Sequence, residues 1–211
     1  QSGNLLFGDN IVASVFHDTE RKKIWVGTWD EGLFLYDEES GDIKHFSQNS
    51  GAIPDNDVHT LFEDNQNRLW LGTQNGVCFY DFKSERFVDF IRPASSNPDV
   101  FKDNRVYDIV QDQEGNIWFG TRNGLHKWNG NDMKSYFHTS YDPNSLTSNF
   151  IYDLLVDEKD QLWVATNKGL NKYNQERDAF IRYKREKMTC ENCLVNNEIL
   201  SLHSSGEFLW I

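Results

Sequence analysis

Short apolar segments recur along the whole chain and are separated by polar turns rich in Asp, Asn and Gly. Residues 106–110 combine β-branched, aliphatic and aromatic side chains, as expected of a buried β-strand. In the turn that follows, Asp112 can bond the backbone two residues on, and Gly115 can take a positive φ. Since the sequence contains no segment with a helical period, the pattern predicts an all-β protein.

One of these segments is present five times, with a tryptophan at the same place. It reads IWVGT, LWLGT, IWFGT and LWVAT in the first four copies and LWI in the fifth. The tryptophans are 45, 48, 45 and 47 residues apart: Trp25, Trp70, Trp118, Trp163 and Trp210. A glycine follows two positions later in three copies, at Gly27, Gly72 and Gly120, and Ala165 takes its place in the fourth. A fixed period in this range indicates a repeat architecture.

The repeat extends well beyond the tryptophan. An asparagine opens each copy, at Asn10, Asn56, Asn104, Asn149 and Asn197. An aspartate stands eight positions later in four copies, at Asp18, Asp64, Asp112 and Asp157, and Ser205 replaces it in the fifth. A small hydrogen-bonding residue lies four positions after the asparagine, at Ser14, Thr60, Asp108, Asp153 and Ser201. If these small residues are buried, they need partners in the backbone or in a tryptophan N–H; the alternative is that they line a wet central channel.

Each copy contains four strand patterns in roughly 46 residues, which is typical of one blade of a β-propeller. The tryptophan would fill the wedge between adjacent blades, and the glycine would leave room for the backbone or a ring of the adjacent blade. We therefore predict a single partial β-propeller built of four-stranded antiparallel blades. It is incomplete, with four full blades and half of a fifth, at approximately 7–52, 53–100, 101–145, 146–193 and 194–211.

The composition of the chain argues against some classes of ligand and against a membrane-spanning segment. The net charge of −12 argues against a nucleic-acid partner, because phosphate binding needs a positive field. The apolar runs are too short to span a membrane, and the first residues lack the charged start and apolar stretch of a signal peptide. The chain is expected to be either a mature form or a part of a larger protein.

The cysteines favour a structural role. Cys78 is predicted to be a small buried residue on a third strand. Cys190 and Cys193 lie in a loop, where one CxxC cannot supply the four ligands of a structural zinc site. A local disulfide in an oxidising compartment is the favoured interpretation, and a reduced pair is the alternative. We predict no metal site and no cofactor.

The complete pattern resembles the two-component regulator propeller repeat. Residues 104–128 carry its best copy, NRVYDIVQDQEGNIWFGTRNGLHKW, and the resemblance extends from about Phe7 to Ile211. It implies the periplasmic sensor region of a Bacteroides-type hybrid two-component histidine kinase, in which propellers precede an immunoglobulin-like domain, a transmembrane helix and a kinase. It also implies a response to oligosaccharides from complex glycans and signalling to the transcription of glycan-utilisation genes. This segment would be linked to the membrane only through the transmembrane helix of the longer parent protein.

Binding residues are predicted from the geometry of a propeller. The hairpin after the tryptophan strand and the loop that enters the next inner strand should emerge on the same face. Aromatic and planar polar side chains suit a saccharide at such a mouth. Trp29, Arg105 and Arg122 are the predicted contacts; the alternative for each is an ordinary exposed loop residue.

Three functions remain open at this point. The first is a ligand-sensing propeller segment that binds an oligosaccharide. The second is an interaction or dimerisation scaffold, which self-associates or packs against further blades of the parent. The third is a propeller lyase, which is disfavoured because no catalytic residue cluster can be placed: the sequence has no G-x-S-x-G and no H-E-x-x-H. We therefore predict that this segment is not an enzyme.

Overall fold

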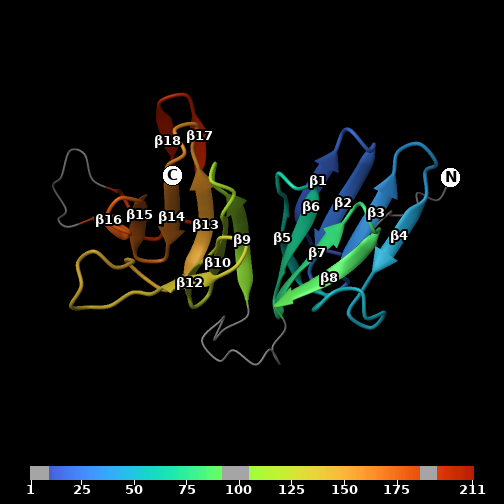
Figure 1. Cartoon of the computed structure of the whole chain (residues 1–211), viewed down its shortest axis with the longest axis horizontal. Helices are drawn as coiled ribbons and strands as arrows, with labels where there is room; N and C mark the ends of the chain where they lie inside the picture. Colours follow the sequence, from blue (N-terminus) through green and yellow to red (C-terminus); the bar gives the residue numbers. More distant parts are fainter. Residues whose placement is uncertain (1–9, 92–104, 186–193) are drawn as a thin grey trace. The chain divides into compact units, whose positions relative to one another are not determined.

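The computed structural model describes residues 10–91, 105–185 and 194–211, and every regular element in them is a β-strand (Figure 1). The strands form four four-stranded sheets and one two-stranded sheet, all antiparallel between neighbours. The first two sheets are β1 (Val12–Asp18), β2 (Lys23–Thr28), β3 (Leu33–Asp37) and β4 (Ile43–Phe46), then β5 (Val58–Glu63), β6 (Arg68–Thr73), β7 (Gly76–Asp81) and β8 (Arg86–Ile91). The all-β propeller prediction is confirmed.

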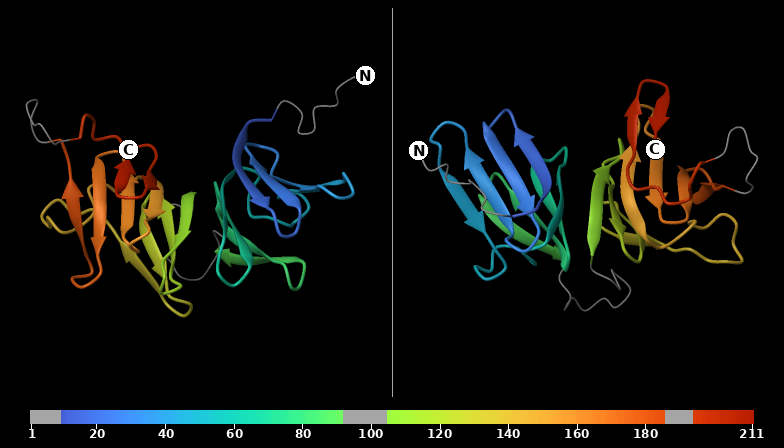
Figure 2. Two further views of the ribbon diagram at one scale, coloured as in Figure 1. Left: turned by 90° about the horizontal axis from the view of Figure 1, so that it is seen from above. Right: turned by 180° about the vertical axis from the view of Figure 1, so that it is seen from behind.

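The remaining sheets follow the same order along the chain (Figure 2). The third is β9 (Val106–Gln111), β10 (Ile117–Thr121), β11 (Gly124–Trp128) and β12 (Met133–Tyr136). The fourth is β13 (Ile151–Val156), β14 (Leu162–Thr166), β15 (Gly169–Asn174) and β16 (Ala179–Tyr183), and β17 (His203–Ser205) pairs with β18 (Phe208–Trp210). The chain divides into two compact units, one with the first two sheets and one from Tyr107 to Ile211, and each is described by itself.

The hydrophobic core of each unit is shared between adjacent sheets. In the first unit, Trp25 and Leu35 of one sheet pack with Val58 and Leu71 of the next. In the second unit, the cluster around Trp118 joins the β9–β12 sheet to the β13–β16 sheet. The tryptophans at 25, 70 and 118 are completely buried, whereas Trp210 on β18 is 61% exposed. Trp25 and Trp118 therefore lie in cores that two sheets of the same unit share.

Three of the tryptophans are fixed by the turn aspartate of their own sheet. The indole Nε1–H donates to a carboxylate oxygen in the pairs Trp70–Asp64, Trp118–Asp112 and Trp163–Asp157, over 2.6, 2.8 and 2.9 Å. The other oxygen of each carboxylate accepts backbone N–H groups of the turn. The sequence predicts the backbone bonds, and the structure adds the indole as a second partner.

A threonine closes each hairpin after the tryptophan strand. Its hydroxyl donates to a glycine carbonyl over 2.8 or 2.9 Å in the pairs Thr28–Gly32, Thr73–Gly76, Thr121–Gly124 and Thr166–Gly169. These four glycines have φ between 89° and 137°, in the region that other residues rarely adopt. The WxGT motif thus encodes both the core tryptophan and the turn that follows it.

The glycine of the motif makes room for the next sheet. A Cβ placed at Gly27 would lie 2.8 Å from Cγ1 of Val58, and one at Gly120 would lie 2.8 Å from Cγ2 of Ile151. Val58 and Ile151 stand at the same repeat position, two residues after the opening asparagine. The small residue therefore sets how closely adjacent sheets pack.

Replacing Gly120 by alanine should destabilise the second unit by about 1–3 kcal/mol, because the added methyl group overpacks the contact with Ile151. Urea unfolding followed by tryptophan fluorescence measures this loss. Ala165→Gly serves as the matched control at the equivalent position and should cost only about 0.5–1 kcal/mol. A Gly120→Ala variant as stable as the wild type would show that the contact is not tight.

Inner strands are also joined from sheet to sheet by side-chain acceptors. Oγ of Ser14 accepts from the backbone N–H of Leu61 over 3.1 Å. Oδ2 of Asp108 accepts from Leu154 N–H over 2.8 Å, and Oδ2 of Asp153 accepts from Leu202 N–H over 2.5 Å. These acceptors occupy the repeat position that was predicted to bond the backbone, and the N–H groups that they bind belong to the following copy.

Burial raises the pKa of Asp108 well above its ordinary value, and the charge of the hydrogen-bonded Asp153 adds to the rise. The folded-state pKa is then higher than the unfolded value of about 3.9. The stability linked to this proton is therefore complete below the unfolded pKa and is lost as the pH rises through the folded-state pKa.

Asp108→Asn should reduce this pH dependence, since an amide oxygen still accepts from Leu154 N–H but does not ionise. Urea unfolding between pH 4.5 and pH 8 should show a larger loss of stability for the wild type than for this variant. Asp108→Ala removes the acceptor and should be less stable than Asp108→Asn by about 1–3 kcal/mol at every pH. Parallel pH profiles for the wild type and Asp108→Asn would contradict the assignment.

Candidate ligand-binding surface

The hairpins after the tryptophan strands lie beside the residues that open the next inner strand. In the first unit, Gly32 N donates to Asn56 O over 2.8 Å, and Asp30 N donates to Oδ1 of Asp57 over 2.8 Å. In the second unit, Gly124 N donates to Asn149 O over 2.8 Å. Each unit therefore gathers its hairpin tips and inner-strand starts at one edge, as the propeller geometry predicts.

The predicted contacts lie at these hairpin tips and inner-strand starts. Trp29 is 51% exposed in the β2–β3 hairpin of the first unit. Arg122 is exposed in the β10–β11 hairpin of the second unit. Arg105 is partly buried and immediately precedes β9. The Arg122 guanidinium lies over the ring of Phe150, a residue of the same unit.

Phe150 is the centre of an aromatic surface formed by Tyr107, Phe150 and Tyr152. The Phe150 ring lies 5.4 Å from that of Tyr107, at an interplanar angle of 29°, and 4.6 Å from that of Tyr152, at 36°. All three side chains are partly exposed. Tyr107 is on β9 and Tyr152 is on β13, so the surface crosses two adjacent inner strands.

Two charged side chains lie next to the aromatic surface. The Arg122 guanidinium lies 5.8 Å from the centre of the Phe150 ring. The Tyr152 hydroxyl donates to Oε1 of Glu198 over 2.9 Å, and Glu198 is exposed. Partial burial and the hydrogen bond to this carboxylate raise the pKa of Tyr152 above its usual value. The hydroxyl therefore stays protonated at neutral pH and remains a hydrogen-bond donor.

This arrangement can hold a flat ligand with apolar faces and polar edges. The rings offer stacking area, while Arg122 donates and Glu198 accepts hydrogen bonds at the rim. The described residues contain no group of three or more His, Cys, Asp or Glu side chains that could hold a metal ion. The rings and the charged rim are suited to binding by contact and hydrogen bonding.

The binding residues predicted from the sequence include none of Tyr107, Phe150 and Tyr152. Both tyrosines stand three positions after the opening asparagine of their copies. Aromatic residues at the same place in consecutive repeats are a signal that aligning the copies would have detected. The first two copies carry Ala13 and His59 there, which is why the surface is confined to the later copies.

Only one of the three cysteines lies in the described part of the chain. Cys190 and Cys193 lie outside the described residues, so their disulfide stays a prediction. Cys78 is buried in the core of the first unit, as predicted. In the parts of the chain that the structure describes, no helix is long and apolar enough to cross a membrane.

The sheets and their shared cores define a β-propeller segment with a candidate binding surface at its loop edge. The family model described as two component regulator propeller matches residues 52–75, 101–123 and 145–168. Each matched segment runs from before an opening asparagine to beyond the tryptophan strand. In these three copies the chain carries two-component regulator propeller repeats.

Two solved structures from B. thetaiotaomicron share the fold. The extracellular domain of one putative hybrid two-component system is 21% identical, with a TM-score of 0.75, covering 95% of this chain and 26% of that chain. The extracellular domain of a second such system is 22% identical, with a TM-score of 0.68, and the likeness covers 91% of this chain and 24% of that chain. At these identities the likeness establishes the fold.

One curated relative is similar in part. The histidine kinase P4 of Formosa agariphila is 35% identical over an alignment of 72 residues, and the match covers 31% of this chain and 5% of the relative. The chain thus spans only a small part of the relatives that it matches.

Proposed function

We propose that this chain is a ligand-sensing segment in the extracytoplasmic region of a hybrid two-component sensor. Its repeats and its similarity to two extracellular domains of such systems support this role. In this proposal the segment itself is not catalytic, and the kinase activity belongs to the parent protein. The location would be periplasmic, with the membrane crossed by another part of the parent.

The proposed ligand is an oligosaccharide released from complex glycans. The observation that carries this proposal is the aromatic surface of Tyr107, Phe150 and Tyr152, with Arg122 and Glu198 next to it. A sugar ring has an apolar face that can lie on an aromatic ring, and its equatorial hydroxyls can bond a guanidinium and a carboxylate at the rim. Binding would be relayed through the parent to the transcription of glycan-utilisation genes.

Calorimetry against a panel of neutral and acidic oligosaccharides tests this proposal. Phe150→Ala should weaken binding of the best ligand by about tenfold or more, since it removes the central ring. Arg122→Gln should produce a smaller loss, because it removes a charge at the rim. Tyr141→Ala is the matched control, as Tyr141 is an aromatic residue 88% exposed in the β12–β13 connection.

Two results would contradict this placement of the site. One is that no oligosaccharide of the panel binds at millimolar concentration. The other is that a ligand binds equally well to the wild type and to Phe150→Ala.

A scaffold function is the second candidate, supported by the two-stranded sheet of the second unit. Phe208 and Trp210 on β18 are 71% and 61% exposed. A groove of about 880 Å³ lies beside this sheet, lined by apolar side chains that include Trp163, Leu194 and Leu209. Among the described residues β18 pairs only with β17, and an apolar edge strand readily pairs with another chain. The occupant that we propose is a second copy of this chain.

Light scattering over a concentration series tests the scaffold function. The mass of the wild type should rise with concentration towards that of a dimer, and Phe208→Asp should keep the chain monomeric by placing a charge in the contact. Tyr141→Asp, which adds the same charge at a distant exposed aromatic, should behave as the wild type. A wild type that stays monomeric at every concentration would rule out this contact.

A further inference from the structure

Two strands in different units, β1 and β18, carry exposed apolar side chains. On β1, Val12 is 46% exposed and Val15 is 58% exposed. On β18, Phe208 and Trp210 are exposed to a similar or greater extent. Neighbouring apolar side chains that remain exposed often mark a surface at which proteins associate. The repeat shows what each of these positions packs against in other copies.

In the second unit, the positions that correspond to Val12 and Val15 are covered by the preceding sheet. The two valines stand two and five places after the opening asparagine of their copy. The residues at these places in the fourth copy are Ile151 and Leu154. Both are buried, and both lie in one core cluster with Trp118 of the β9–β12 sheet. The pair therefore packs against the tryptophan face of the sheet before it.

The same contact is present within the first unit. Val58 and Leu61 stand at the two places in the second copy, and they belong to the core cluster of Trp25. A Cβ on Gly27, two places after that tryptophan, would lie 2.8 Å from Cγ1 of Val58. An aliphatic pair at these places thus fits the tryptophan strand of another sheet, and β1 carries such a pair on an exposed face.

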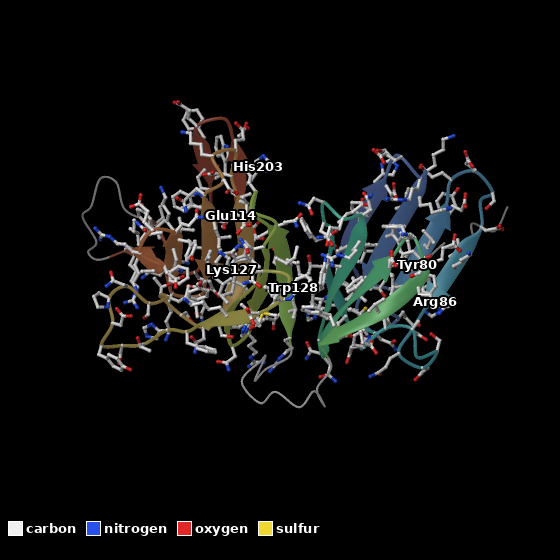
Figure 3. The ribbon with its side chains drawn as sticks, in the orientation of Figure 1. Tyr80, Arg86, Glu114, Lys127, Trp128 and His203 are labelled. Atoms are coloured by element: carbon white, nitrogen blue, oxygen red, sulfur yellow. The ribbon has the colours of Figure 1, made fainter. Side chains whose placement is uncertain are left out.

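On β18, the tryptophan face is the exposed one. Leu209 packs into the core that the β13–β16 sheet supplies. Side chains alternate along a strand, so Phe208 and Trp210 point to the other face. His203 of β17, labelled in Figure 3, pairs directly with Trp210 and lies on the same face, where it is exposed as well. This is the face that the tryptophans of the first and third copies turn toward the following sheet.

We propose that β18 of one copy of this chain packs on β1 of a second copy, with Trp210 of the first against Val12 and Val15 of the second. The inference rests on the proposed scaffold function and identifies the surface that β18 meets. Within each unit the tryptophan face of one sheet meets the aliphatic face of the next inner strand, which favours β1 over a second β18 as the partner.

A contact between two different surfaces is heterologous, and this has a consequence for assembly. One such contact leaves a β1 face and a β18 face free, whereas two contacts between the same two chains close a dimer. Each chain therefore has two separate halves of the interface, and a substitution can remove one half and leave the other intact.

Light scattering of two complementary variants tests the contact. Val15→Asp places a charge on the β1 face, and Trp210→Asp places one on the β18 face. Each variant alone should keep the mass of a monomer throughout a concentration series. An equimolar mixture should rise to the mass of a dimer and no further, because each chain retains the face that the other has lost.

Val88→Asp is the matched control, since it makes the same change at an exposed valine of the outer strand β8. It should associate as the wild type does. Far-ultraviolet circular dichroism should show unchanged β content in all three variants, because the replaced side chains are exposed. Val12→Asp should act as Val15→Asp does and takes its place if the latter loses β content.

The outcomes separate this inference from the scaffold function. A wild type that stays monomeric at every concentration would overturn both. If the wild type and Val15→Asp both dimerise while Trp210→Asp does not, β18 meets a second β18, so the scaffold function stands and the β1 contact is rejected. A mixture of the two variants that stays monomeric would also reject the contact between β18 and β1.

Discussion

Burial of one sheet against the next is the constraint on which this protein depends. No sheet covers its own inner face, so the apolar residues of each copy find their partners about one repeat away along the chain. Trp25 and Trp118 sit at these shared cores because an indole fills the wedge between two twisted sheets. Val12 and Val15 on β1, the first strand of the first sheet, remain exposed.

Hydrogen bonds hold in place the side chains and backbone segments that packing brings together. The turn carboxylate orients the indole, the threonine hydroxyl closes the hairpin, and the side-chain acceptors of Ser14, Asp108 and Asp153 hold the backbone of the following copy. Buried polar atoms are costly unless paired, and the repeat provides a partner at each of these positions. A departure from the repeat therefore has a local physical consequence. The turn of the first copy is one residue longer, Arg21 binds its carboxylate, and the buried Nε1–H of Trp25 has no partner among the described residues.

The candidate sites arise where the copies differ from one another. Repeat positions that carry the fold are nearly constant, whereas the residues one and three places after the opening asparagine vary from copy to copy. In the second unit this variation places Tyr107 and Tyr152 beside Phe150. A propeller can thus keep its stability in the constant positions and change its ligand through the variable ones.

The sequence by itself determined the fold class, the strand order and the structural role of the turn residues, because all three follow from local patterns repeated at a fixed period. The aspartates at 64, 112 and 157 could be assigned to turns from their position alone. Only the tertiary structure decided which variable residues meet. Arg122 was selected from the sequence, but its partner Phe150 lies 28 positions further along the chain and comes from the following copy.

The unpaired Trp25 likewise could not be read from the sequence, because the extra turn residue gives no indication that Arg21 captures the carboxylate. Contacts between copies depend on side-chain direction and on the exact spacing of the sheets. The local sequence pattern determines neither the side-chain direction nor the spacing of the sheets. Both are determined by how the sheets pack.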